Sequence, residues 1–165
     1  MKMKLLSVAT AALVLQLTTL AFAASDGSQA FDQLKSLAGS WSGKIPDGHT
    51  VEVSNRLTSG GSVLMSEIMG HEDMITMFHM DGDRLLMTHY CAAGNQPRMV
   101  GTLSPDGKTI TFTFLDATNL LPSQGGHMER VVFTLIDANH HTEEWQFVGN
   151  DGQKHREMFD LQRQN

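Results

Sequence analysis

The most restrictive feature of this 165-residue sequence is a series of short, strand-like segments separated almost throughout by turns of two to five residues. The clearest segment is 108–115, where Ile110, Phe112 and Phe114 alternate with threonines. Such alternation is typical of a strand with one buried face. We predict ten strands, at residues 40–45, 49–58, 62–69, 74–80, 84–91, 97–103, 108–115, 127–136, 141–148 and 153–161.

Short connections between consecutive strands favour an antiparallel meander. An open sheet of ten strands would expose two edges and one apolar face, and closing the sheet removes both problems. The predicted fold is therefore all-β, a ten-stranded antiparallel up-and-down barrel. A two-sheet sandwich is the competing architecture, because strand number does not determine closure.

One short N-terminal helix is predicted before the strands, at residues 25–38. Phe31, Leu34 and Leu37 have the spacing of an apolar helical stripe, and Gly39 follows as a helix-ending residue. No second helical pattern is present downstream, so this helix is expected to cover part of the barrel.

The first residues have the pattern of a secretory signal peptide. Lys2 and Lys4 precede an apolar stretch at 5–20, and an Ala-x-Ala sequence follows. We predict a signal peptide at 1–23 and a single β-barrel domain at 24–165, exported to the periplasm or the extracellular space. An uncleaved membrane anchor is the competing interpretation; after cleavage no membrane insertion is expected.

Charge and cysteine content narrow the classes of partner. The formal net charge of −6 argues against nucleic acid and anionic membrane surfaces, which require a basic surface. Cys91 is the single cysteine, so an internal disulfide is impossible and packing must stabilise the domain. We expect a monomer whose Cys91 is buried and unreactive.

Most candidate ligand-binding side chains lie in a predicted hairpin around Asp81-Gly82-Asp83. If the strand phase is maintained across this turn, odd-numbered residues share one face. That face would carry Met77, His79, Met87, His89 and Cys91, and the other face would carry Phe78, Leu86, Thr88 and Tyr90. The first group would place soft and ionisable side chains inside the barrel.

The loop after this hairpin, residues 92–98, is the second candidate binding element. Asn95, Gln96 and Arg98 could hold the polar end of an apolar ligand, with Arg98 facing a carboxylate. The alternative is a rigid turn whose side chains satisfy its own backbone. The predicted ligand-binding residues are Met77, His79, Met87, His89, Tyr90, Cys91, Asn95, Gln96 and Arg98.

Methionine is frequent in the predicted strands. Its unbranched, polarizable side chain suits a surface that adapts to an apolar ligand, although ordinary core filling is the simpler explanation for each residue. The methionines that suggest a soft interior are Met65, Met69, Met77, Met87, Met99 and Met128.

A helix followed by Gly39-Ser40-Trp41 resembles the G-x-W opening of the calycins, which include the lipocalins and fatty-acid-binding proteins. The strand number looks most like the nitrobindin-like branch. The resemblance implies that Trp41 plugs the closed end of the barrel and that an Arg of the last strand, Arg156 or Arg163, packs over its ring. The segment 89–98 also resembles small exported bacterial proteins of unassigned function.

The nitrobindin-like resemblance further implies haem bound by a His near the C-terminus, and His155 lies in that region. From the residues themselves, His79 and His89 near methionine and Cys91 would suit copper or haem iron. No tight metal motif supports this, and imidazoles at solvent or at the barrel rim are the competing interpretation.

No nucleophile elbow, phosphate loop or paired-carboxylate spacing is present, so the sequence does not predict an enzyme. It predicts an exported barrel that binds a small apolar or amphipathic molecule. The alternatives are a haem- or copper-binding barrel using His79, His89 or His155, and a protein-interaction module with a filled core.

Overall fold

The computed structural model describes residues 26–45, 48–70 and 72–165, so the predicted signal peptide lies outside the described residues. These described residues include one α-helix, α1 (Asp26–Ser36), and two 3-10 turns. The strands are β1 (Gly39–Lys44), β2 (Thr50–Thr58), β3 (Val63–Met69), β4 (Met74–Asp81), β5 (Arg84–Tyr90), β6 (Gln96–Leu103), β7 (Thr109–Thr118), β8 (Gly126–Asp137), β9 (His140–Gly149) and β10 (Lys154–Arg163). Each predicted strand is confirmed, with ends that move by a few residues. Within the described ranges, no helix is both long and apolar enough to cross a membrane.

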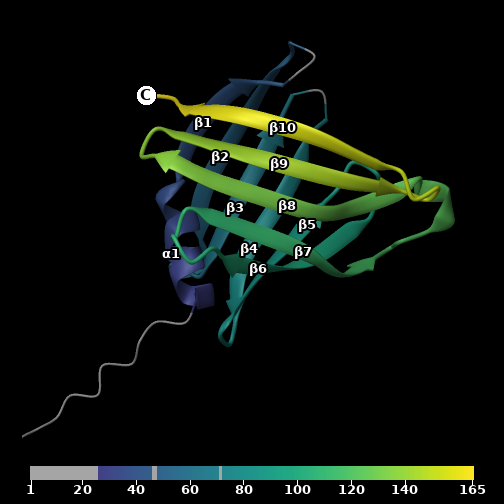
Figure 1. Ribbon diagram of the computed structural model, residues 1–165, viewed down its shortest axis with the longest axis horizontal. Helices are drawn as coiled ribbons and strands as arrows, with labels where there is room; N and C mark the ends of the chain where they lie inside the picture. Colours follow the sequence, from purple (N-terminus) through teal and green to yellow (C-terminus); the bar gives the residue numbers. More distant parts are fainter. Residues whose placement is uncertain (1–25, 46–47, 71) are drawn as a thin grey trace, which may run out of the picture.

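The strands form one closed antiparallel barrel in which each strand pairs with its neighbours in sequence. The short strand β1 completes the ring, because it pairs with β2 on one side and with β10 on the other. The ring is visible in Figure 1, where β10 runs beside β9 across the front of the barrel. Closure confirms the barrel and excludes the two-sheet sandwich.

The two ends of the barrel differ. Helix α1 lies across the end where β1 begins and β10 finishes (Figure 1), and it contacts β4, β5 and β6. Phe31 and Leu34 of the helix are buried, as predicted from the apolar stripe. The helix packs very closely against the turn between β4 and β5. A Cβ atom added at Gly27 would lie only 2.2 Å from the Asp83 carbonyl oxygen. We call this the closed end, and the opposite end the mouth.

Aromatic side chains fill the middle of the lumen. Phe78 lies 5.4 Å from Phe112 and 5.7 Å from Phe133, measured between ring centroids, and Phe133 also contacts Trp145. Such tilted and edge-to-face pairs are the favoured geometry of aromatic packing. The interior is therefore a packed core in its centre, and space for a ligand must lie nearer the mouth.

Trp41 on β1 seals the closed end. Its side chain is 1 % exposed, its indole N–H donates a hydrogen bond of 2.7 Å to the Leu37 carbonyl, and the Arg163 guanidinium carbon lies 4.2 Å from the ring centroid. Gly39 precedes it with a φ of 124°, a conformation that favours glycine. Of the two arginines that the resemblance left open, the structure selects Arg163.

Replacing Arg163 with alanine should lower the free energy of unfolding by about 2 kcal/mol, since the guanidinium also donates to three backbone carbonyls, those of Ser36, Ala38 and Ala138. Urea denaturation monitored by tryptophan fluorescence measures the loss. Arg156→Ala is the matched control. The Arg156 side chain is 62 % exposed, and its removal should cost less than about 1 kcal/mol. Equal losses from the two variants would contradict the assigned role.

Candidate binding site at the mouth of the barrel

The hairpin of β4 and β5 differs from the predicted phase. Asp81 pairs directly with Arg84, so the loop has two residues, Gly82 and Asp83, where a three-residue turn was expected. Even-numbered residues of β4 therefore share a face with odd-numbered residues of β5, because directly paired residues point the same way. The predicted grouping of Met77 and His79 with Met87 and His89 is wrong.

The corrected phase places His79 and Met77 on the outer surface of the barrel. His79 pairs with Leu86 and Met77 pairs with Thr88, and all of these lie on the outer face. Tyr90 is also outside, with half of its surface exposed. These three predicted site residues therefore do not face the lumen.

His89 and Met87 are the predicted side chains that do point into the barrel, and both are fully buried. His89 Nδ1 lies 2.9 Å from the Thr76 hydroxyl, and its ring packs 4.8 Å from the Trp145 ring. Its Nε2 has no hydrogen-bond partner among the described residues. Burial lowers the pKa of His89 to about 4, so the imidazole is neutral at physiological pH.

His89 belongs to a polar row that crosses four adjacent strands. Asn55 on β2 pairs with Ser66 on β3, Ser66 pairs with Thr76 on β4, and Thr76 pairs with His89 on β5. All four side chains are buried, and Asn55 donates to the Leu37 carbonyl. Only His89 of this row was predicted as a site residue, because Asn55, Ser66 and Thr76 belong to no motif and are brought into one row only by the strand register.

A second buried polar group lies on β9 and was not predicted. Glu143 accepts hydrogen bonds from the indole N–H of Trp145, at 2.9 Å, and lies 3.2 Å from His141 Nε2. His141 in turn packs edge-on against Trp41, with centroids 4.3 Å apart. Alternation along β9 points residues 141, 143 and 145 inward, and this pattern was the available sequence signal. His141, Glu143 and Trp145 therefore connect Trp41 at the closed end to the aromatic core.

The methionines are divided between the two faces, so the predicted soft lining is only partly present. Met87 and Met99 are fully buried in the core, and Met128 packs against it. Met65 is buried on the outer face, where the Arg56 guanidinium contacts its sulfur at 3.7 Å. Met69 lies at the mouth.

Residues 91–95 connect β5 to β6, and polar side chains of the predicted 92–98 segment contact the neighbouring 118–126 segment. Asn95 is buried and donates to the Gly126 carbonyl at 2.8 Å, and the Gln96 side-chain oxygen accepts from Thr118. The Gly94 carbonyl accepts from Asn119 at 2.6 Å and from Gln124 at 3.1 Å. The alternative of a rigid, self-satisfied turn is therefore the better description, extended to the neighbouring 118–126 segment.

Arg98 faces outward, contrary to the prediction that it would meet a ligand carboxylate. Its guanidinium pairs with Asp116 across β6 and β7, with Arg98 Nε 2.6 Å from Asp116 Oδ1. The hydrogen bonds from Arg98 lower the pKa of the Asp116 carboxyl.

Cys91 is half-buried, and burial raises the pKa of its thiol, so the thiolate is disfavoured.

The predicted metal ligands do not converge. His155 is exposed on β10, where it pairs with Phe147, His79 lies outside the barrel, and His89 is buried in the core. Within the described part of the chain, no three His, Cys, Asp or Glu side chains are close enough to hold a metal ion. The three histidines therefore lie in three different environments.

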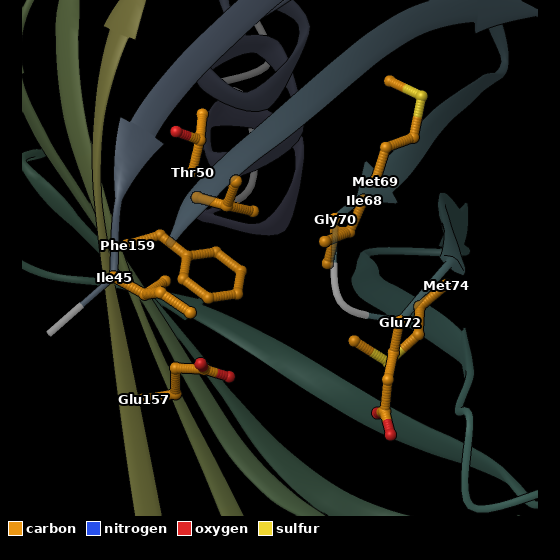
Figure 2. Close-up of a pocket in the computed structure, with 10 residues that line it drawn as sticks. Ile45, Thr50, Ile68, Met69, Gly70, Glu72, Met74, Glu157 and Phe159 are labelled. Carbon is orange, nitrogen blue, oxygen red and sulfur yellow. The ribbon is translucent and has the colours of Figure 1, made fainter. Parts of the chain in front are cut away.

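A pocket of about 190 Å³ opens at the mouth, lined by residues of β2, β3, β4 and β10 and by Ile45, Gly70 and Glu72, which lie next to strand ends. Figure 2 shows the Phe159 ring and Ile45 on one side, with Glu72 and Met74 on the other. The lining residues are Ile45, Thr50, Val51, Ile68, Met69, Gly70, Glu72, Met74, Glu157 and Phe159.

This pocket was missed by sequence reasoning, which placed the ligand beside the β4–β5 hairpin and loop 92–98. The lining comes from the start and the end of the domain, and it meets only because β1 joins β2 to β10. The sequence signal that could have located the pocket was the position of residues relative to the turns. Inward-facing residues next to the turns at the end opposite Trp41 must surround the mouth.

Comparisons with known proteins support the fold. No protein-family model matches the chain, and no curated protein matches it. Among solved structures, Rv2717c from M. tuberculosis has a TM-score of 0.60 at 18 % identity, covering 82 % of this chain and 98 % of that one. A protein of unknown function from the DUF3598 family of Nostoc punctiforme has a TM-score of 0.55 at 12 % identity. That match covers 81 % of this chain, which spans about half (49 %) of the Nostoc protein. At these identities the likeness shows a shared barrel fold.

Proposed function

We propose that this protein is an exported, calycin-like, monomeric barrel that binds a small apolar or amphipathic molecule in the pocket at its mouth. One observation carries the proposal: a pocket of about 190 Å³ with apolar walls, including Val51, Ile68 and Phe159, lies at the open end of a barrel. Ligand sites are concave and mostly apolar, and they commonly lie in the mouths of β-barrels. Trp41 and α1 block the other end, so entry is from the mouth.

The volume limits the size of the ligand. A closed apolar cavity of about 150 Å³ is enough to hold benzene, whereas drug-sized ligands occupy roughly 300–1,000 Å³. A pocket of about 190 Å³ therefore suits one ring with a short substituent, or an alkyl chain of similar size. The aromatic core of Phe78, Phe112 and Phe133 limits deeper insertion of a long acyl chain.

Haem is a poor fit for the described residues. A porphyrin contains four pyrrole rings, whereas the pocket has room for about one ring. Neither His89 nor His155 is among the lining residues, and His89 Nε2 is enclosed beside Trp145. We therefore assign no function through haem. Binding is the activity that we propose.

The proposal predicts that residues 24–165, purified after signal removal, bind 2-phenylethanol with a dissociation constant in the millimolar range or below. The reason is burial of one phenyl ring against apolar walls, which contributes roughly 25 cal/mol per Å² of apolar surface. Amide chemical shifts in a two-dimensional NMR titration provide the measurement. We expect the shifts to concentrate on β10, β1, β2, β3 and β4.

Thr50→Trp is the blocking variant, because Thr50 is an exposed residue on the rim of the pocket. Thr118→Trp is the matched control, since Thr118 is an exposed strand residue at the same end of the barrel and does not line the pocket. Thr50→Trp should abolish the saturable shifts and Thr118→Trp should retain them. If no one-ring compound produces saturable shifts, the proposal fails and the interaction-module alternative becomes the better explanation.

A further inference from the structure

The polar row lies directly below the floor of the mouth pocket. Ile68 and Met74 form this floor, because both line the pocket and they pair with each other across β3 and β4. The next inward-facing residues toward the closed end are Ser66 on β3 and Thr76 on β4, which also pair with each other and belong to the row. Since two residues of a strand span about 7 Å, a single layer of side chains separates the pocket from the row.

His89 is the member of the row that has an unpaired polar atom. It pairs with Thr76 on one side, and on the other its ring contacts Trp145, which pairs with the pocket-lining residue Glu157. The imidazole is fully buried, and its Nε2 has no hydrogen-bond partner among the described residues. Nearly all buried polar atoms of native proteins have a partner, so this nitrogen marks a place where a ligand atom can bind.

We propose that the pocket binds neutral one-ring compounds that carry a hydroxyl group, and that the hydroxyl points inward and forms a hydrogen bond with His89 Nε2. This inference rests on the proposed function, because it names the ligand class of the same pocket. Met74 is the side chain that moves to admit the hydroxyl. It is half-buried, and its unbranched, flexible chain adapts to a neighbouring group more readily than the branched Ile68.

A hydroxyl group matches His89 in either tautomer. If Nδ1 accepts a hydrogen bond from the Thr76 hydroxyl, Nε2 carries the proton and donates to the ligand oxygen. If Nδ1 instead donates to Thr76, Nε2 accepts the proton of the ligand hydroxyl. Burial lowers the pKa of His89 to about 4, so at neutral pH the imidazole has no charge with which to hold a carboxylate.

The energetic gain comes from a nitrogen atom that is already out of contact with bulk water. A ligand hydroxyl loses a hydrogen bond to water and gains one to Nε2, whereas the protein loses none. A hydrocarbon of the same shape gains only burial against Val51, Ile68 and Phe159, and a carboxylate would be buried without a cation. The affinity for the hydroxyl compound relative to the hydrocarbon should therefore depend on Nε2.

The test compares phenol with toluene, in which a methyl group of similar size replaces the hydroxyl. Two-dimensional NMR titrations of residues 24–165 give both dissociation constants, and long-range proton–nitrogen spectra resolve the two ring nitrogens of each histidine. Phenol at saturation should shift the Nε2 resonance of His89, and toluene should leave it unchanged. Benzoate, an anion of similar size, should bind more weakly than phenol.

His89→Phe should lower the phenol-to-toluene affinity ratio by about fivefold, the amount expected for one hydrogen bond. His79→Phe is the matched control, because it makes the same replacement on the outer face of β4 and should leave the ratio unchanged. Circular dichroism checks the folding of both variants. If His89→Phe does not fold, the Nε2 resonance of the parent protein decides the question.

The outcomes separate the two proposals. Saturable binding of phenol and toluene without a response of His89 Nε2 to phenol overturns this inference and leaves the proposed function standing. A ratio that His79→Phe lowers as much as His89→Phe, or benzoate binding as tight as that of phenol, also overturns it. If phenol, toluene and 2-phenylethanol all fail to produce saturable shifts, the proposed function fails as well.

Discussion

Replacement of Trp41 by alanine should lower the free energy of unfolding by about 4 kcal/mol, a large part of the 5–15 kcal/mol that typically stabilises a domain. The indole is almost fully buried, its N–H donates to the Leu37 carbonyl, and Arg163 and His141 pack on its ring. Alanine would leave a cavity and remove the surface that orients both neighbours. Urea denaturation monitored by far-ultraviolet circular dichroism gives the free energy without relying on tryptophan fluorescence.

Two further variants test whether the loss of stability is specific to the Trp41 side chain. Ile136→Ala removes a side chain that is half exposed near the end of β8 and should cost less than about 0.5 kcal/mol. Trp41→Phe retains an aromatic ring but loses the hydrogen bond, so its loss should be intermediate. A Trp41→Ala protein within about 1 kcal/mol of the parent would show that the closed end does not depend on this plug.

Acidification should destabilise the fold through His89. Burial lowers the pKa of His89 to about 4 in the folded protein, whereas an unfolded histidine titrates near 6.5. Between these values the unfolded chain binds a proton that the folded chain does not, so the free energy of unfolding falls as pH falls from about 6.5 to about 4. The full contribution is present above pH 6.5. At about 1.4 kcal/mol per pH unit, the expected loss is roughly 3 kcal/mol.

The measurement is a set of urea denaturation curves between pH 7.5 and 4 for the parent and two variants. His89→Gln should flatten the decline, since glutamine can retain a polar contact with Thr76 and does not titrate. His79→Gln is the control, because His79 lies on the outer face and its replacement should leave the slope unchanged. A parent and a His89→Gln protein with parallel curves would exclude His89 as the source of acid sensitivity.

The sequence was sufficient to predict the architecture because local signals agreed along the chain. Each strand had either alternation or a bounded apolar run, and the turns between them contained Gly, Asp, Asn or Pro at the places where the chain reverses. The 108–115 segment, with Phe112 inward and threonines outward, shows this agreement most clearly. Closure followed from the cost of exposed edges, a global argument that needed no knowledge of contacts.

The site was predicted less well because inward and outward positions depend on single-residue details of turns. Asp81 was assigned to the loop, but it pairs with Arg84 as the last pair of the ladder. That one residue moved His79 from the lumen to the surface and left His89 inside. Alternation within a strand is visible in sequence, whereas the phase between two strands is set by loop length.

The position of the pocket around the mouth could not be predicted from the sequence, for a different reason. Ile45 and Glu157 are separated by most of the domain, and neither belongs to a motif. They meet because β1 lies between β2 and β10, a consequence of closure. A reader of the sequence could expect a mouth but could not determine which arc of the ring remains open.

The pairing of β1 with β10 has a consequence for how the chain reaches its native state. Trp41 is aligned with Arg163, so the last seam of the ring joins residues separated by nearly the whole domain. Contacts of such long sequence separation slow folding, because chain entropy is lost before they form. A nascent chain that lacks β10 has two unpaired edges, so we expect the ring to close only after β10 has been synthesised.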